Sequence, residues 1–181
     1  MNDFRNSRDS SDSRPRPAYR DRRSQPGRPR TAPKKNLFVN KSPEGSEQWL
    51  TPWVELKYFT YNPAVFPRML GSVSGEIAPG SLVHVYDKNG ELFGAGFWNE
   101  ASRTPLRVVY HGKDAFTERD LDAALERAVK LRREILRLDE TTNAYRVLHG
   151  DSDGLGGLVV DRYADVLSLE VSTLAVWQRL D

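Results

Sequence analysis

The feature that most limits the possible folds is a change in hydrophobic periodicity near residue 112. Before it, short apolar runs alternate with turn sequences. Leu82–Tyr86 and Leu92–Trp98 flank the turn 87–90, whose Asn-Gly pair favours the positive φ values of a tight hairpin. Leu106–Tyr110 follows as a further strand. Short strands joined by tight turns are typical of a small β-barrel.

After residue 112 the period changes to that of a helix. Apolar residues recur at three- and four-residue steps, at Leu121, Ala124, Leu125, Ala128, Leu131, Ile135 and Leu138. This spacing predicts an amphipathic helix over 117–138, with Thr117 and Asp120 as a capping box at its start. The pattern then returns to strands at 144–148, 158–163 and 166–171.

Two other sequence features refine this picture. Gly94 and Gly96 interrupt an apolar strand, which indicates a β-bulge or a close approach of two backbones. Residues 53–59 form a partly alternating run, which favours one more strand. We therefore predict an α+β fold with a small β-barrel over 37–112, followed over 113–181 by an α/β segment of one helix and a β-hairpin.

Residues 1–36 have a composition that cannot build a core. They contain eleven Arg and Lys but only four Asp, a net charge of +7, so the remainder of the chain carries −5. A segment with few apolar residues does not offset its ordering entropy, and we predict a disordered basic tail. We interpret this tail as an electrostatic tether to RNA phosphates. The alternative is a solubilising tail.

The composition also excludes several classes of protein. The chain contains no cysteine, so it has no disulfide framework, no Cys-based zinc site and no thiol nucleophile. No apolar run approaches the roughly 18–20 residues of a membrane span. The N-terminus lacks the apolar region of a secretory signal, and its four aspartates argue against a transit peptide. We predict a cytoplasmic protein with no membrane partner.

We predict no catalytic, cofactor-binding or metal-binding residue in this chain. The glycine cluster 154–157 leads into a strand rather than a helix and stands beside Asp151 and Asp153, so it indicates a hairpin turn rather than a nucleotide-binding loop. A calcium loop starting at Asp151 would place Arg162 where a carboxylate is required. The histidines are far apart in sequence and receive no role: His84, His111 and His149.

Two longer stretches carry a resemblance to a known family. The first runs from Tyr61 to Val109 and includes the segments 62–66 (NPAVF) and 94–99 (GAGFWN). The second, 145–163, reads YRVLHGDSDGLGGLVVDRY. Together they resemble the PUA-domain-containing, SAM-dependent methyltransferases that modify cytosine C5 in large-subunit ribosomal RNA, where the second stretch reads much like YRLVHGESDGLPGLIVDRY. Asp151, Gly156 and Ala64 depart from the family residues Glu, Pro and Trp.

The resemblance implies a PUA-like RNA-binding domain over 37–112 and, over 113–181, a segment leading into a methyltransferase domain that this chain lacks. It implies SAM as the cofactor of the complete protein, with none bound by this chain. It also implies RNA, in particular large-subunit ribosomal RNA, as the partner, and it permits a homodimer of the full-length form. Family position further suggests that Asp153, Asp161 and Arg162 orient the methyltransferase domain. The alternative is a stand-alone, non-catalytic PUA-type RNA-binding protein.

Four residues are the candidates for RNA contact. Arg68, Arg103 and Arg107 are the basic residues expected on the rim of the predicted barrel, and Trp98 is its candidate for an exposed aromatic side chain. Proteins recognise RNA by placing cations against phosphates and by stacking aromatic rings on unpaired bases. The alternative for Trp98 is a place in the core, and the three arginines of the helix end (Arg132, Arg133 and Arg137) are interpreted as a solvated face, with an RNA site as the alternative.

Overall fold

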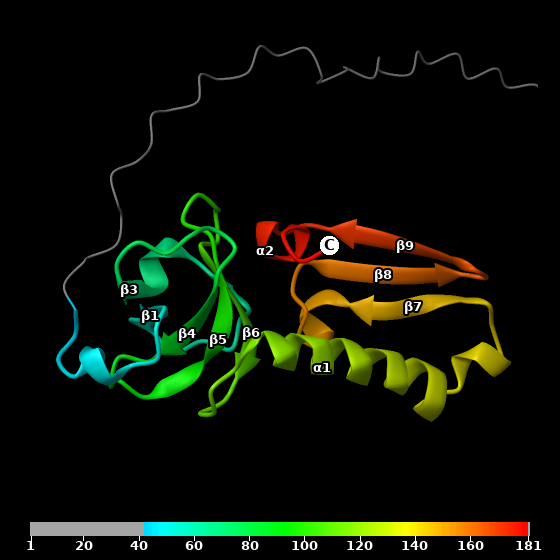
Figure 1. Cartoon of the computed structure of the whole chain (residues 1–181), viewed down its shortest axis with the longest axis horizontal. Helices are drawn as coiled ribbons and strands as arrows, with labels where there is room; N and C mark the ends of the chain where they lie inside the picture. Colours follow the sequence, from blue (N-terminus) through cyan, green and yellow to red (C-terminus); the bar gives the residue numbers. More distant parts are fainter. Residues whose placement is uncertain (1–41, 181) are drawn as a thin grey trace, which may run out of the picture. The chain divides into compact units, whose positions relative to one another are not determined.

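The computed structural model describes residues 42–180, and the predicted disordered tail lies outside them. Within one compact unit, the described residues form a six-stranded sheet, a three-stranded sheet and one long helix, α1 (Figure 1). The predicted α+β class is confirmed. The division of the chain at residue 112 stays a prediction.

The first sheet curls on itself into a half-barrel (Figure 1). Its strands are β1 (Trp53–Leu56), β2 (Ala64–Val65), β3 (Leu70–Val73), β4 (Leu82–Tyr86), β5 (Leu92–Trp98) and β6 (Leu106–His111). They lie in the order β2-β6-β5-β4-β1-β3, and β1 pairs with β4 in parallel while the other neighbours are antiparallel. The apolar side chains on its inner face, such as Val54, Val83 and Leu106, are fully buried and form the first core.

The glycines of β5 allow two backbones to approach closely. A Cβ atom at Gly94 would lie 2.0 Å from the carbonyl oxygen of Tyr110, and one at Gly96 would lie 2.5 Å from that of Arg107. The β5–β6 register shifts between Ala95 and Gly96. A close backbone approach with a bulge was predicted here, and it is confirmed.

One predicted strand is shorter than expected. β1 ends at Leu56, because its partner β3 pairs with it only as far as Leu70. The chain then leaves the sheet, and the aromatic side chains of Tyr58 and Phe59 are exposed. The prediction of a strand through residue 59 is therefore wrong in its last three residues.

Helix α1 (Glu118–Lys130) begins with the predicted capping box. The Thr117 backbone N–H donates to the Asp120 carboxylate at 2.7 Å, which supplies a partner at the helix start. The α-helical geometry stops at Lys130, before the predicted end at 138, and a π-helical turn, η4 (Leu131–Ile135), follows. A short 3-10 turn, η5 (Leu138–Glu140), completes the connection to the second sheet.

Arg137, which lies in this connection directly before η5, adopts a left-handed backbone with φ of 52°. An L-residue with a side chain is disfavoured there by roughly 1 kcal/mol, whereas glycine is not. We expect Arg137→Gly to raise the free energy of unfolding by about 0.5 kcal/mol, because the ion pair lost with Glu140 is exposed and weak. Urea denaturation measures this change. Arg137→Ala, which keeps the backbone strain, is the control and should give no gain.

The second sheet is an antiparallel meander of β7 (Ala144–His149), β8 (Leu158–Tyr163) and β9 (Val166–Val171). All three strands were predicted, the last two as a hairpin, and the pairing of β7 with β8 joins them into one sheet. The glycine cluster forms part of the turn between β7 and β8, together with the 3-10 turn η6 (Gly150–Asp153), and it leads into a strand as predicted. A short helix, α2 (Leu174–Trp177), follows β9.

A second core joins the two sheets. Helix α1 contributes Leu121 and Ala124, the second sheet contributes Leu148 and Val160, and the outer face of β5 contributes Phe97. Because residues from both parts share one buried cluster, the half-barrel and the α/β segment stabilise each other.

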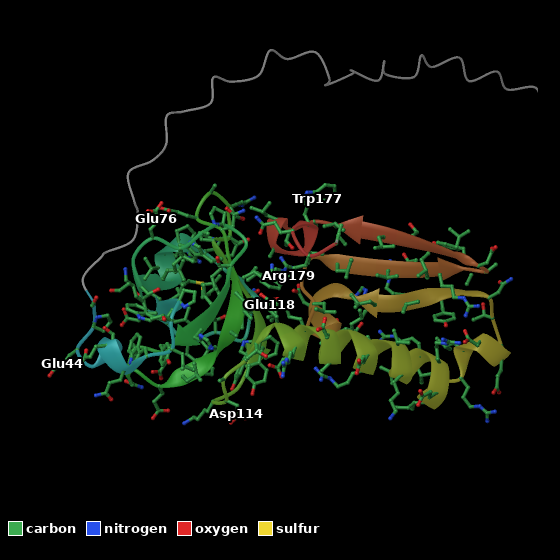
Figure 2. The ribbon with its side chains drawn as sticks, in the orientation of Figure 1. Glu44, Glu76, Asp114, Glu118, Trp177 and Arg179 are labelled. Carbon is green, nitrogen blue, oxygen red and sulfur yellow. The ribbon has the colours of Figure 1, made fainter. Side chains whose placement is uncertain are left out.

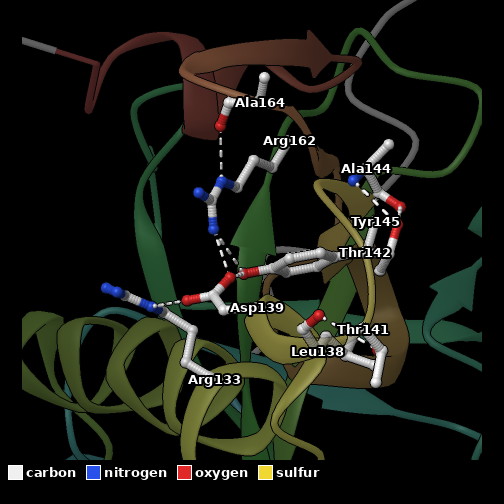
Figure 3. A network of polar contacts seen from close by, with 9 residues as sticks. All are labelled: Arg133, Leu138, Asp139, Thr141, Thr142, Ala144, Tyr145, Arg162 and Ala164. Atoms are coloured by element: carbon white, nitrogen blue, oxygen red, sulfur yellow. Dashed lines mark hydrogen bonds and ion pairs between the residues drawn. The ribbon is translucent and has the colours of Figure 1, made fainter.

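The far end of the α/β segment is held by a polar network around Asp139 (Figure 3). The Asp139 carboxylate accepts hydrogen bonds from the Tyr145 hydroxyl at 2.6 Å and from Arg133 Nε at 2.8 Å, and it pairs with Arg162. Arg162 also donates to the carbonyl of Ala164 at 2.7 Å. The hydrogen bond from Tyr145, followed by that from Arg133, holds the pKa of Asp139 below its ordinary value. The network links the end of the helical connection to both hairpins.

Arg179, which follows α2, connects three parts of the chain and lies next to Glu118 at the start of α1 (Figure 2). Its guanidinium donates to the Glu118 carboxylate at 2.8 and 2.5 Å, and to the carbonyls of Gly80 and Ala175 at 3.0 and 2.8 Å. It also lies 4.9 Å from the centre of the Phe97 ring. The hydrogen bond to Glu118 raises the pKa of Arg179, so the group is charged at all relevant pH values.

Replacing Arg179 by methionine keeps the apolar stem and removes these hydrogen bonds. We expect the free energy of unfolding to fall by about 2 kcal/mol, the typical value for hydrogen bonds to charged groups. Chemical denaturation followed by tryptophan fluorescence measures the loss. Arg179→Lys should recover only part of it, because an ammonium group lacks the planar fork that binds a carboxylate through two parallel bonds. An unchanged midpoint would show that these contacts contribute nothing to folding.

Candidate nucleic-acid interface

The three arginines proposed from the sequence lie at different places on the half-barrel. Arg68 lies on η3 (Pro67–Met69), just after β2, and Arg103 lies on the loop between β5 and β6; both are exposed. Arg107 lies on β6 and is engaged elsewhere, because it donates to Asp151 of η6 at 2.9 and 2.5 Å. Arg107 thus joins the half-barrel to the α/β segment. An RNA contact by any of the three stays a prediction.

Trp98 does not have the exposure that was predicted. Its side chain has a relative exposure of 2% and packs in the first core with Val54 and Leu106. A buried ring has no free face for a base, so the expectation of an exposed stacking aromatic at Trp98 is wrong. The reason is the curl of the sheet: Trp98 pairs with Leu106 across the β5–β6 ladder, and both side chains lie on the inner face that encloses the first core.

A group of aromatic side chains that includes strongly exposed rings lies at the other end of this hairpin. We define the aromatic cluster as Phe59, Tyr61, Phe93 and His111. Phe59 meets the edges of Tyr61 and Phe93 with ring centres 4.7 and 5.0 Å apart, and His111 lies 5.4 Å from Tyr61 and 5.2 Å from Phe93. Phe59 and Tyr61 are 64% and 69% exposed.

The elements of the half-barrel position these rings. Phe93 lies at the start of β5 and His111 at the end of β6, where the two strands are adjacent. Phe59 and Tyr61 lie on the segment between β1 and β2, whose turn is held by hydrogen bonds from the N–H of Asn62 to Thr60 and from the N–H of Ala64 to Asn62, both at 2.9 Å. These hydrogen bonds fix the backbone turn that carries Phe59 and Tyr61.

The aromatic cluster borders a hollow of about 330 Å³ whose rim is charged. Lys113 Nζ pairs with the Glu91 carboxylate at 2.8 Å, and this hydrogen bond raises the pKa of Lys113. The Asp87 carboxylate accepts from the backbone N–H groups of Asn89 and Glu91, both at 2.9 Å, so it is committed to its own turn. Burial lowers the pKa of His111, which favours a neutral imidazole at neutral pH.

Sequence reasoning missed this cluster. Tyr58, Phe59 and Tyr61 were included in a strand or in a family motif, and His111 received no role. A signal was present: three aromatic residues stand within four positions directly before Asn62-Pro63, a turn sequence that does not continue a buried strand. What the sequence did not reveal is that Phe93 and His111 complete the group from two other strands.

The arginines of the predicted helix end separate into two kinds. Arg133 and Arg137 are exposed, as expected of a solvated face. Arg132 is only 13% exposed and binds the Asp153 carboxylate through two bonds, at 2.7 and 2.9 Å. The interpretation of Arg132 as part of a solvated face is therefore wrong. Arg132 lies on the side of the π-helical turn that faces η6, where Asp153 is located.

Other kinds of site find no support between residues 42 and 180. No group of three or more His, Asp or Glu side chains in this range is placed to hold a metal ion. No helix in the described part of the chain has the length and apolar character needed to cross a membrane. The residues around the glycine cluster do not fit SAM either, because Gly154–Gly157 precede strand β8 and both neighbouring aspartates are bound to arginines.

Comparison with known proteins identifies the half-barrel. Residues 50–110 match the PUA-like domain family. The chain is homologous to proteins named ribosomal RNA large subunit methyltransferase. It is 36% identical over 155 residues to one from Deinococcus radiodurans, covering 83% of this chain and 35% of that protein. It is 32% identical over 118 residues to methyltransferase I from Shewanella amazonensis, covering 65% of this chain and 30% of that protein. The chain thus spans about a third of the length of these relatives.

Two solved structures share the fold. One is a putative SAM-dependent methyltransferase from Streptococcus mutans, with a TM-score of 0.51 and 16% identity over 70% of this chain and 35% of that one. The other is a putative methyltransferase solved in complex with SAH, with a TM-score of 0.51 and 15% identity over 71% of this chain and 34% of that one. These matches confirm the prediction that the chain contains a PUA-like domain and is related to ribosomal RNA methyltransferases.

Proposed function

We propose that this chain is the RNA-binding N-terminal part of a SAM-dependent methyltransferase that modifies cytosine C5 in large-subunit ribosomal RNA. In this proposal residues 37–112 bind RNA, residues 113–181 connect them to the catalytic domain, and that domain lies outside the chain. The protein acts in the cytoplasm, where its RNA substrate is found.

The extent of the similarity to the Deinococcus radiodurans protein carries the proposal. The PUA-like match ends at residue 110, but the alignment covers 83% of the chain. Whatever its first residue, an alignment that covers this much of the chain must include helix α1. A stand-alone RNA-binding module would share the half-barrel alone, so the shared α/β segment favours the methyltransferase over the alternative.

The exposed strand β9 gives independent support. Val166, Leu167 and Leu169 are 59%, 57% and 52% exposed, and no other strand of residues 42–180 pairs with the outer edge of β9. An apolar strand with an open edge is an aggregation hazard unless a partner covers it. We assign this face to the catalytic domain. In the same way, SAM is assigned to that domain, because the described residues do not fit it.

The RNA-binding role rests on the PUA-like half-barrel and its exposed cations. Arg68 and Arg103 are free to reach phosphates, and we retain both as proposed contacts. Arg107 contributes by fixing the half-barrel on the α/β segment through Asp151. The basic segment 1–36 is proposed to add a salt-dependent attraction to any RNA.

Two measurements test the proposal. Titration of this chain with a large-subunit ribosomal RNA fragment should give a Kd that rises steeply with salt, as expected when cations contact phosphates. The intact mass of the native protein in its source cells should be well above the 20.6 kDa of this chain, and that protein should transfer a labelled methyl group from SAM to the RNA. RNA binding with a native mass of 20.6 kDa would instead establish the stand-alone module. Absence of RNA binding would overturn both.

A further inference from the structure

The aromatic cluster has features that the folding of the half-barrel does not explain. Phe59 and Tyr61 are each more than 60% exposed, yet the Phe59 ring is in edge-to-face contact with both Tyr61 and Phe93. Exposed aromatic groups of this kind usually mark a binding surface, because leaving them in water is unfavourable. The ring contacts already present in the free protein limit the rearrangement that binding a ligand would require.

We propose that the aromatic cluster and Lys113 bind one unpaired nucleotide of RNA, with the base stacked on Tyr61, the Phe59 ring standing at 89° to the Tyr61 ring beside it, and the phosphate next to Lys113. This inference rests on the proposed RNA-binding function and adds to it the kind of RNA recognised: a loop, bulge or single strand rather than a continuous duplex. Paired bases in an A-form helix offer no free face for stacking.

The hollow beside the rings suits such a ligand in size and charge. Its volume of about 330 Å³ accommodates a single nucleotide rather than a helix or a protein strand. Lys113 is 77% exposed, and its partner Glu91 is 62% exposed. An ion pair in water is weak, so Lys113 exchanges the Glu91 carboxylate for a phosphate at little cost. The Glu91 carboxylate then accepts a hydrogen bond from the exocyclic amino group of a base.

The cluster lies apart from the arginines already proposed. Tyr61 and His111 lie at the open end of the β5–β6 hairpin, near Phe93, and Arg103 lies on the loop at its other end. The strand from Phe93 to Trp98 spans about 17 Å at the usual rise per residue. The two groups therefore contact different parts of an RNA, and their contributions can be measured separately.

The test uses the 181-residue chain and two labelled RNAs of equal length: a hairpin with a loop of unpaired bases, and a blunt duplex. We expect Tyr61→Ala to weaken hairpin binding about tenfold, the typical effect of losing one stacked base, and to leave duplex binding within twofold. Tyr61→Phe, which keeps the stacking face, should bind the hairpin like the wild type. Lys113→Ala should lower the slope of log Kd against log salt by about one.

A fluorescent base gives a second readout. 2-Aminopurine placed in the loop should lose fluorescence on binding to the wild type and retain it with Tyr61→Ala. Tyr163→Ala is the matched control, because Tyr163 is an exposed aromatic residue (56%) on β8, outside the cluster. It should change neither readout, and thermal melts should show that all variants fold.

The outcomes separate this inference from the proposed function. If Tyr61→Ala binds both RNAs like the wild type while Arg68→Ala or Arg103→Ala weakens both, the half-barrel binds RNA but the cluster does not take a base. Equal binding of hairpin and duplex by the wild type, with unchanged 2-aminopurine fluorescence, would also overturn the inference. The cluster would then be assigned to the binding of a protein partner. Failure of the wild-type chain to bind either RNA would overturn the proposed function itself.

Discussion

Arg132→Met is expected to lower the free energy of unfolding by about 3 kcal/mol. The Arg132 and Asp153 side chains are 13% and 11% exposed and share two hydrogen bonds at 2.7 and 2.9 Å. Methionine fills much the same space as arginine, but it leaves the largely buried Asp153 carboxylate without an opposite charge beside it. Breaking such a pair by removing one partner costs about 3–5 kcal/mol, and we take the lower value because some water reaches the pair. Urea denaturation of the intact chain measures the change.

The neighbouring residue offers a matched control. Arg133 lies on the same π-helical turn and pairs with Asp139, but its side chain is 60% exposed. Arg133→Met should therefore cause a much smaller loss, because exposed ion pairs contribute little. Equal losses for the two variants would show that burial does not determine the strength of the Arg132 pair.

The same pair predicts how stability changes with pH. Burial acts to raise the pKa of Asp153, but hydrogen bonds from Arg132 and from the backbone N–H of His149 outweigh it and hold the pKa below its ordinary value. A carboxyl with a lowered pKa stabilises the fold above its unfolded pKa of about 3.9, and the contribution is lost as the pH falls through the folded value. The stabilities of the wild type and Arg132→Met should therefore converge below about pH 4. A constant difference down to pH 2 would contradict this account.

Gly94→Ala is expected to destabilise the chain by about 3 kcal/mol, the upper part of the range for overpacked sites. The added Cβ would lie 2.0 Å from the carbonyl oxygen of Tyr110 and 3.0 Å from its carbonyl carbon. Both atoms belong to the backbone of β6, so relief requires the strands to separate and their ladder to weaken. Thermal and chemical denaturation measure the loss, and the variant should unfold at a clearly lower temperature.

Gly71→Ala is the control for this substitution. Gly71 also lies in a strand, β3, but the nearest atoms to its added Cβ belong to the flexible side chain of Glu55. That side chain can rotate away at the cost of its hydrogen bond from the Ser72 N–H, which is worth about 1 kcal/mol. A loss at Gly94 no larger than at Gly71 would mean that the β5–β6 ladder adapts to a side chain.

The contacts between the half-barrel and the α/β segment bear on the proposed function. Arg107 binds Asp151, Arg179 binds both Glu118 and the carbonyl of Gly80, and Phe97 joins the second core. These contacts hold the half-barrel, for which RNA binding is proposed, in one orientation on the segment proposed to precede the catalytic domain. A different role, orienting the methyltransferase domain, was suggested for Asp153, Asp161 and Arg162. Each makes contacts within the α/β segment, with Arg132, Arg146 and Asp139, and their effect on the catalytic domain stays a proposal.

Much of the secondary structure followed from local patterns. The bounds of β4 and β5, the capping box at Thr117, and the turn nature of the glycine cluster were all predictable, because each depends on residues adjacent in sequence. The net charge of residues 37–181 and the absence of cysteine also followed directly from the sequence. The relation to ribosomal RNA methyltransferases was visible in two motifs.

The site depended on information that adjacent residues do not carry. Whether Trp98 faces the core or the solvent is decided by how the sheet curls, and the burial of Arg132 by the position of Asp153, 21 residues later. The aromatic cluster joins residues from three separate elements. The sequence by itself therefore determined the class of fold, its elements and its relatives. Only the tertiary structure decided which rings and charges meet, because those contacts arise from strand pairing and core packing between distant parts of the chain.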